Sequence, residues 1–392
     1  MDVRQPDRTT RKTTQWIYRG IAGALVILFL ASVARFYHPR TGFTALIGFP
    51  AGHEYELPAL RGVPHHDYAL TSYDGQFYAQ LALEPLLRDP AVDRAMDLAP
   101  YRARRILFSW TAYLLGLGRP AWILEAYALQ NVACWLILAA VLARWIAPTS
   151  GRGLALWGAC LFSHGALWSV RFALLDVPSL LLIALAVAAV EKGRPLLSAA
   201  IVGIAGLGRE TNVLAAVAQP LPRDRRSWAR LVVALVLTAL PLLIWADYLW
   251  SIYRSTVLSQ TDQLAIPGTG LAHGWRNVLF RDIPEKGLFS TQGLWLALLF
   301  SLAVQALYLV VRRAYSVPWW RVAVVYAVLM LELNRVLADP LTGAITRVLL
   351  PLTVGYNIIL ASEPRGSRFW LWFAAGNLHL LAATSIMPLI PW

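Results

Sequence analysis

The sequence predicts an all-α polytopic membrane protein, and three observations support this fold class. Of 392 residues, 58% are hydrophobic and 15% are charged. The mean hydropathy of +0.53 lies far above that of a soluble domain. Several apolar runs reach the roughly 18–20 residues that a helix needs to cross a bilayer. Because a chain in lipid must satisfy its backbone polar groups internally, we expect a bundle of about 11 transmembrane helices forming a single integral-membrane domain over residues 1–392.

The charged residues indicate contact with membrane lipids. The formal net charge is +13, yet the cations are scattered among apolar runs instead of forming a tract. This pattern argues against nucleic acid as a partner and favours cytoplasmic loop bias and binding of anionic headgroups. Cys134 and Cys160 both fall inside apolar runs, which predicts buried thiols instead of a disulfide.

The first third of the chain is predicted to place a long loop outside the membrane. A basic segment over residues 1–15 is expected in the cytoplasm, followed by a first helix over 16–34. Residues 35–120 then form the first outer loop, with a short helix over 76–87. Within this loop, the segment 101–118 has only about a dozen apolar residues after its arginines, which is too few to span. It is therefore predicted to be a helix lying in the outer interface.

The remaining helices follow from the apolar runs and from the bias of basic residues toward the cytoplasm. This bias places Lys192 and the cluster that begins at Arg223 inside, and a second outer loop covers residues 250–290. The segment 196–222 has basic flanks on both sides and is predicted to be a hairpin of two short helices. The other expected spans are 121–146, 154–172, 176–191, 231–248, 291–311, 319–337, 343–361 and 369–390.

The stretch Ser72-Tyr73-Asp74-Gly75-Gln76-Phe77-Tyr78, in the first outer loop, contains the candidate base, Asp74. An Asp-Gly pair is also common in turns and helix caps, so the structural alternative for Asp74 is a cap or turn. The adjacent glycine would let a substrate approach the carboxylate closely. Three arginines follow in Tyr101-Arg102-Ala103-Arg104-Arg105, and a carboxylate followed by a cationic cluster is suited to attack on a phosphate-bearing molecule.

In the predicted topology, further ionisable groups reach the same outer face. Such groups are costly in a membrane protein unless they are paired or used. Each also has a structural alternative: the loop arginines can snorkel to headgroups, Asp176 can cap a helix, and Arg209 and Glu210 can pair with neighbouring helices. The candidate residues of this face are Arg102, Arg104, Arg105, Asp176, Arg209, Glu210, Arg335 and Arg347.

The sequence does not predict a metal site. The adjacent residues His65, His66 and Asp67 lie in a loop, where neighbouring side chains do not present a defined ligand face. A divalent cation there remains an alternative. No glycine-rich phosphate loop of the nucleotide-binding kind, nucleophile elbow or paired-cysteine motif occurs.

The order of these features resembles the GT-C superfamily of membrane glycosyltransferases. The motifs that carry the resemblance lie between about residues 70 and 215: Tyr73-Asp74-Gly75-Gln76-Phe77-Tyr78, the arginine motif at Tyr101, and Gly206-Leu207-Gly208-Arg209-Glu210-Thr211. The chain departs from the pattern in two ways. Many relatives have paired acids in the first loop, whereas Asp74 stands alone, and several carry a soluble domain after the last helix.

The resemblance implies an inverting glycosyltransferase that needs no cofactor. It would move a sugar from a polyprenyl-phosphate donor to a glycan, lipid or protein acceptor at the outer, periplasmic face of a bacterial inner membrane. Polyprenyl phosphate is a good leaving group, so the acceptor hydroxyl needs a base more than the donor needs an acid. Arginine forks suit the developing phosphate charge. The roles implied are Asp74 as base, Arg102, Arg104, Arg105, Arg209 and Arg347 on the phosphate, and Tyr73, Gln76, Asp176, Glu210 and Arg335 as supporting residues.

Two other classes of function stay open. A transporter of lipid-linked saccharides or solutes would also combine arginines with a helix bundle, but it would more often contain two symmetric halves, and no internal symmetry is visible. A ligase or polymerase of lipid-linked sugars would use arginines without depending on a loop aspartate.

Overall fold

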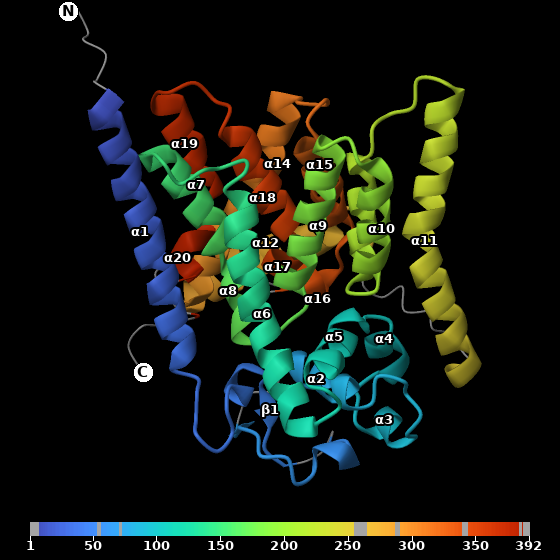
Figure 1. Cartoon of the computed structure of the whole chain (residues 1–392). Coiled ribbons are helices and arrows are strands. Elements are labelled where there is room, and N and C mark those ends of the chain that lie inside the picture. The colour runs from blue at the N-terminus through green and yellow to red at the C-terminus, as the bar shows by residue number, and fades with distance from the viewer. Residues whose placement is uncertain are drawn as a thin grey trace, which may run out of the picture.

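The computed structural model is a helix bundle with a layer of short elements at one end (Figure 1). It describes residues 8–52, 56–69, 73–254, 265–286, 291–338, 344–383 and 386. Ser72 of the candidate motif and parts of the second outer loop therefore lie outside the described residues. Helices α1 (Arg8–Ala34) and α11 (Arg225–Tyr253) stand at opposite flanks of the bundle in this view.

Among the described residues, four helices are long and apolar enough to cross a membrane by length and composition. They lie in α1, α6 (Pro120–Leu142), α11 and α14 (Thr291–Arg312). A fifth span results if α7 (Gly151–Leu161) and α8 (His164–Arg171), bent by 45°, act together. These helices confirm the predicted all-α polytopic fold. The count of about 11 spans stays a prediction.

Shorter helices fill the bundle between these spans. The expected single helices over 154–172 and 343–361 are each broken in two, so both predictions were wrong in detail. Ser163 caps α8 by accepting a hydrogen bond from the Ala166 N–H, and Pro351 lies in the first turn of the helix that begins at Leu350. The shorter elements are α9 (Asp176–Glu191), α10 (Pro195–Gly206), the 3-10 helix Glu210–Ala218, α12 (Thr269–Asn277), the π-helix Val278–Asp282, α13 (Ile283–Lys286), α15 (Pro318–Glu332), α16 (Arg335–Ala338), α17 (Ala344–Val348), α18 (Leu350–Leu360), α19 (Ser367–Gly376) and α20 (His379–Ala383).

The first outer loop folds into the layer at the end of the bundle, which we call the loop layer (residues 35–118). The helix predicted over 101–118 is split into two, and the second part, nine residues long, is too short to span a bilayer. A two-stranded parallel sheet pairs β1 with β2. The elements are the 3-10 helices Thr44–Leu46 and Pro58–Leu60, β1 (Phe49–Pro50), β2 (Asp67–Tyr68), α2 (Gly75–Leu83), α3 (Ala91–Arg94), α4 (Ala99–Ala103) and α5 (Leu107–Leu115).

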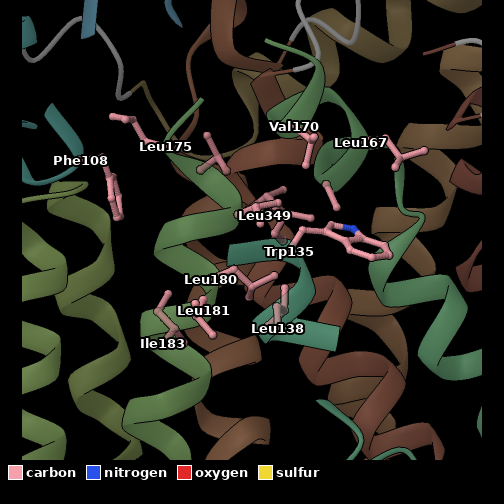
Figure 2. Packing of buried hydrophobic residues seen from close by; sticks show 14 of the residues in the cluster. Phe108, Trp135, Leu138, Leu167, Val170, Leu175, Leu180, Leu181, Ile183 and Leu349 are labelled. Carbon is pink, nitrogen blue, oxygen red and sulfur yellow. The ribbon is translucent and has the colours of Figure 1, made fainter. Parts of the chain in front are cut away.

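The centre of the bundle is packed by large apolar side chains from α6, α8 and α9 (Figure 2). Trp135 of α6 is fully buried there, and its indole Nε1 donates a hydrogen bond to the Leu161 carbonyl at 2.9 Å. Leu138, from the same helix, belongs to the same buried cluster as Leu180 and Leu181 of α9. Since lipid tails are as apolar as leucine, close packing and satisfied donors stabilise this core more than water exclusion does.

Helix α11 contacts the bundle along one side only. Just 11% of its most apolar 18-residue window is buried, as expected for a helix facing lipid. It packs closely on α10 at Gly203, because glycine has no Cβ there. A Cβ on this residue would lie 2.3 Å from the Leu237 carbonyl oxygen. Its C-terminal half also holds the loop layer: Trp245 Nε1 donates to the Ala103 carbonyl at 2.8 Å. Helix α11 therefore fixes the loop layer against the bundle.

Candidate functional site

Asp74 precedes α2 directly, yet its carboxylate does not cap that helix. It occupies the N-cap position and makes no side-chain capping hydrogen bond. Instead, its Oδ1 accepts a hydrogen bond from Arg102 Nη2 at 3.1 Å, and its side chain is 38% exposed. The geometry therefore does not support a capping role for Asp74. The carboxylate faces the arginine motif, and part of it is open to solvent.

Gly75 has a packing role that the sequence does not indicate. A Cβ on this residue would lie 2.2 Å from the Phe172 carbonyl oxygen and 2.7 Å from that of Ile47. The glycine therefore lets the start of α2 pack against the C-terminal end of α8. The expectation that this glycine lets a substrate approach Asp74 closely stays a prediction, since these contacts concern only the space around Gly75 itself.

Arg102 is shared between two carboxylates, and the second one, Asp97, was missed by the sequence analysis. Arg102 Nε donates to Asp97 Oδ1 at 2.9 Å, and its Nη2 donates to Asp97 Oδ2 at 2.7 Å. This is a bidentate, charge-assisted pair. Asp97 lies five residues before Arg102, which is not the three- or four-residue spacing that marks helical ion pairs, so the sequence held no local signal for it. The structure therefore gives Asp74 an acidic neighbour.

Glu210 binds the other two arginines of the motif. Arg105 Nε donates to Glu210 Oε2 at 2.9 Å, and Arg104 Nε lies 3.4 Å from Oε1. Arg105 also contacts the Tyr78 hydroxyl at 3.3 Å. The ring of Tyr101 lies beside all three guanidinium groups, with centroid distances of 4.5, 4.9 and 5.4 Å, so cation–π contacts hold them together.

Asp176 binds the two arginines that come from the bundle. Its side chain is 2% exposed, and it forms ion pairs with Arg209 and with Arg347, the latter at 3.1 Å. Arg347 Nη2 also donates to the Tyr73 hydroxyl at 3.0 Å. The N-cap of α9 is Leu175, so the alternative role of Asp176 as a helix cap is not supported either.

These pairs form one continuous cluster at the junction of the loop layer and the bundle. Arg209 and Glu210 are adjacent in sequence, and so are Tyr73 and Asp74, which joins the three groups of ion pairs. The cluster holds five guanidinium groups and four carboxylates, so one positive charge is in excess. We call it the arginine–carboxylate network: Asp74, Asp97, Arg102, Arg104, Arg105, Asp176, Arg209, Glu210 and Arg347.

A small pocket, partly open to solvent, adjoins the deep end of the network. Arg209, Arg347 and Asp176 line it, together with Ser179 and Thr211. Both hydroxyl groups and the Nε of Arg347 are buried without a hydrogen-bond partner among the described residues. Since leaving buried polar groups unpaired is costly, these atoms indicate a site for a polar ligand or water.

The loop end of the network also contains buried polar groups without a partner. Gln76 is 2% exposed, and its Oε1 accepts no hydrogen bond from the described residues. The Tyr127 hydroxyl on α6 is in the same situation, and its ring interacts electrostatically with Asp74 and Arg102. Gln76 was predicted as a supporting residue, whereas Tyr127 lies within an apolar run and gave no signal.

The electrostatic surroundings keep the Asp74 carboxylate ionised. Burial raises its pKa, but the guanidinium groups of Arg102 and then Arg347 lower it by more, so the pKa lies below its ordinary value of 3.8. Asp74 is therefore deprotonated at neutral pH and can accept a proton, although these same cations make it a weaker base than an isolated aspartate.

Two sets of residues from the sequence analysis lie apart from the network: the supporting residue Arg335, and His65 and Asp67, which were considered as metal ligands. Arg335 is exposed at the start of α16, and no ion pair joins it to the described part of the network. His65 Nε2 pairs with Asp67 Oδ1 at 3.1 Å beside the small sheet. The described ranges contain no grouping of three or more histidine, cysteine, aspartate or glutamate side chains that could hold a metal ion.

Comparison with known proteins gives one family and one solved structure. The model of glycosyltransferase family 87 matches residues 106–340. The crystal structure of ArnT from Cupriavidus metallidurans in the apo state aligns with a TM-score of 0.47 and 17% identity, over 93% of this chain and 63% of that chain. This chain thus spans less than two thirds of the length of that protein. No curated protein matches.

Proposed function

This chain belongs to glycosyltransferase family 87, and from that premise we propose that it moves a sugar from a polyprenyl-phosphate donor to an acceptor at the outer face of the membrane. It is an integral-membrane enzyme. The observation that carries the proposal is the Asp74 carboxylate, which caps no helix and faces Arg102 while remaining 38% exposed. A carboxylate that is ionised, partly open to solvent and not used as a helix cap meets the requirements of a general base.

In the proposed reaction, Asp74 takes the proton from the acceptor hydroxyl. The acceptor oxygen bonds to the anomeric carbon as the bond from that carbon to the phosphate oxygen breaks, and the bonding electrons leave with the phosphate. Attack opposite the leaving group inverts the anomeric centre. Negative charge grows on the phosphate, so fixed guanidinium groups stabilise the transition state more than the ground state.

The distribution of charge supports Arg209 and Arg347, together with Arg105, as the phosphate ligands. Asp176 and Glu210 each face two guanidinium groups, whereas Arg102 alone faces two carboxylates. The excess positive charge therefore belongs to the deep end of the network, next to the pocket. Of the five arginines that the resemblance implied as phosphate ligands, Arg102 therefore fits that role least, whereas Arg104, beside Glu210, keeps it.

We further propose that the loop layer faces the periplasm of a bacterial inner membrane and that the reaction needs no metal. The cation bias of the loops supports this orientation. Phosphate charge can be met by arginine forks alone. The acceptor would be a glycan, lipid or protein. Family membership argues against the transporter alternative, and a ligase or polymerase without a catalytic aspartate is distinguished by the experiment below.

The test is sugar transfer by purified protein from a polyprenyl-phosphate donor, with wild type beside Asp74→Asn. Asparagine keeps the shape of the side chain but accepts no proton, so turnover should fall by roughly 10²–10⁴-fold. Asp67→Asn is the matched control, because Asp67 is a loop acid that pairs with His65 and not with an arginine. Donor binding should persist in both variants. Unchanged transfer by Asp74→Asn would remove the catalytic assignment.

A further inference from the structure

We propose that Asp97 is a positioning residue. By binding Arg102 with both carboxylate oxygens, it prevents that guanidinium from forming a bidentate pair with Asp74. The inference rests on the proposed function of Asp74 as the base. It starts from the geometry of Arg102, whose Nε and Nη2 both donate to Asp97, at 2.9 and 2.7 Å. Asp74 receives only a third, longer hydrogen bond, at 3.1 Å from the same Nη2.

The two acids therefore do not share Arg102 equally. A fork-to-fork pair fixes the plane of the guanidinium and takes up two of its donors. The Arg102 side chain is 8% exposed, so it has little freedom to rotate toward another partner. Asp97 is 37% exposed and is held by a further hydrogen bond from the Leu98 N–H at 2.8 Å. This arrangement leaves one Asp74 oxygen beside Arg102 and does not engage the other with it.

The consequence for the base is chemical. A carboxylate locked in a bidentate pair with arginine is a poor proton acceptor, because both oxygens are engaged and the ionised form is strongly favoured. The other groups that act on Asp74 are Arg105, Arg347 and the Tyr73 and Tyr127 hydroxyls. Among the cations, Arg102 lowers the pKa of Asp74 most. Limiting Arg102 to a single hydrogen bond with Asp74 is thus the most direct way to preserve the basicity of Asp74.

Asp97→Asn tests this idea because it removes the charge that competes with Asp74 while keeping the shape. Turnover should fall by about tenfold, because Arg102 would then be free to bind both oxygens of Asp74 and weaken it as a base. Donor binding and the acceptor KM should stay near wild type. Asp97→Glu restores the charge and should recover most of the turnover. Asp89→Asn is the matched control, since this loop acid accepts a hydrogen bond from the Ala91 N–H and touches no arginine.

A double-mutant cycle separates this role from a merely structural one. If Asp97 acts through Arg102, Asp97→Asn should change turnover less than about twofold in an Arg102→Gln background. An equal loss in both backgrounds would overturn the inference. If Arg102→Gln transfers too little sugar to measure, Arg102→Lys replaces it, because lysine cannot form the fork. If Asp97→Asn does not fold, Asp97→Ser runs the same cycle and can still accept from the Leu98 N–H.

Failure of this inference differs from failure of the proposed function. If Asp74→Asn transfers sugar normally, the base is elsewhere and both proposals fall. If Asp74→Asn is inactive while Asp97→Asn is folded and fully active, Asp74 remains the base and only the positioning role of Asp97 is lost.

Discussion

At the scale of the residue, the sequence predicted which ionisable groups come together better than it predicted how they pair. Asp74, the arginine motif, Asp176 and Glu210 could all be found because charges next to apolar runs are costly unless used. Most of their partners were not predictable, since ion pairs such as that of Arg105 with Glu210 join elements that are distant along the chain. Asp97 was missed for a different reason: it lies five residues before Arg102, outside the spacing of helical ion pairs, and only the fold of the loop layer turns it toward Arg102.

Replacing Arg105 with alanine should impair use of the donor. Arg105 is buried and joins Glu210 to Tyr78, so its loss removes a fixed positive charge from the deep end of the network. We expect the kcat/KM for the donor to fall by roughly 10²–10³-fold, the range for deletion of a preorganised donor. Arg365→Ala is the control, because Arg365 is exposed and lies outside the network. Equal losses in the two variants would indicate general effects on membrane anchoring.

The pH dependence of turnover should report the state of Asp74. The pKa of this carboxyl is lowered from 3.8, so the ionised base is present at neutral pH and is lost only as the pH falls below that value. Arg102→Gln removes the cation that lowers this pKa most, so the acid limb of kcat/KM should move to higher pH. A limb that stays in place would mean that another group titrates.

At the scale of the element, most helices could be read from apolar runs, but their breaks could not. α6, α9 and α14 begin and end within a few residues of the predicted bounds, whereas α11 is longer than predicted and α10 was expected only as part of the hairpin over 196–222. The breaks between α7 and α8 and between α4 and α5 depend on caps and on packing against other elements. Even so, residues on both sides of the second break contact α2: Arg102 lies over the Phe77 ring, Arg105 contacts the Tyr78 hydroxyl, and Ser109 Oγ donates to the Tyr78 carbonyl at 2.7 Å.

Gly75→Ala should loosen the junction between the loop layer and the bundle. The added methyl group would lie 2.2 Å from the Phe172 carbonyl oxygen, so α2 must shift. Forced overpacking of this kind costs about 1–3 kcal/mol, visible as a lower midpoint of thermal unfolding. Gly158→Ala is the control, because its Cβ meets nothing within 4 Å and alanine favours a helix. Unaltered stability and turnover in Gly75→Ala would show that the junction is compliant.

At the scale of the whole molecule, the fold class followed from hydropathy, whereas the direction of the chain across the membrane rests on the distribution of charge. Helices α1 and α11 both begin at the end of the bundle opposite the loop layer (Figure 1). Basic residues cluster there, including the run that starts at Arg223. This agreement between geometry and charge supports a single orientation, with the arginine–carboxylate network on the outer side.

Reporter fusions test that orientation directly. Fusions after Lys192 and Arg225 should report from the cytoplasm, because both residues lie next to helix ends that carry the basic bias. A reporter inserted beside the exposed Arg61 in the loop layer should report from the periplasm. A periplasmic signal at Lys192 would reverse the proposed sidedness of the reaction.

The single excess positive charge of the network affects how the donor would bind and how the spent carrier would leave. In the proposed reaction, a donor linked through a phosphodiester would carry one negative charge and neutralise the cluster on arrival. The proton that reaches Asp74 would then add one positive charge to the cluster as the departing phosphate gains a second negative charge, since the second pKa of a phosphate monoester is about 6. Once Asp74 passes its proton to water, the dianion would exceed the charge of the cluster by one, which favours release of the spent carrier.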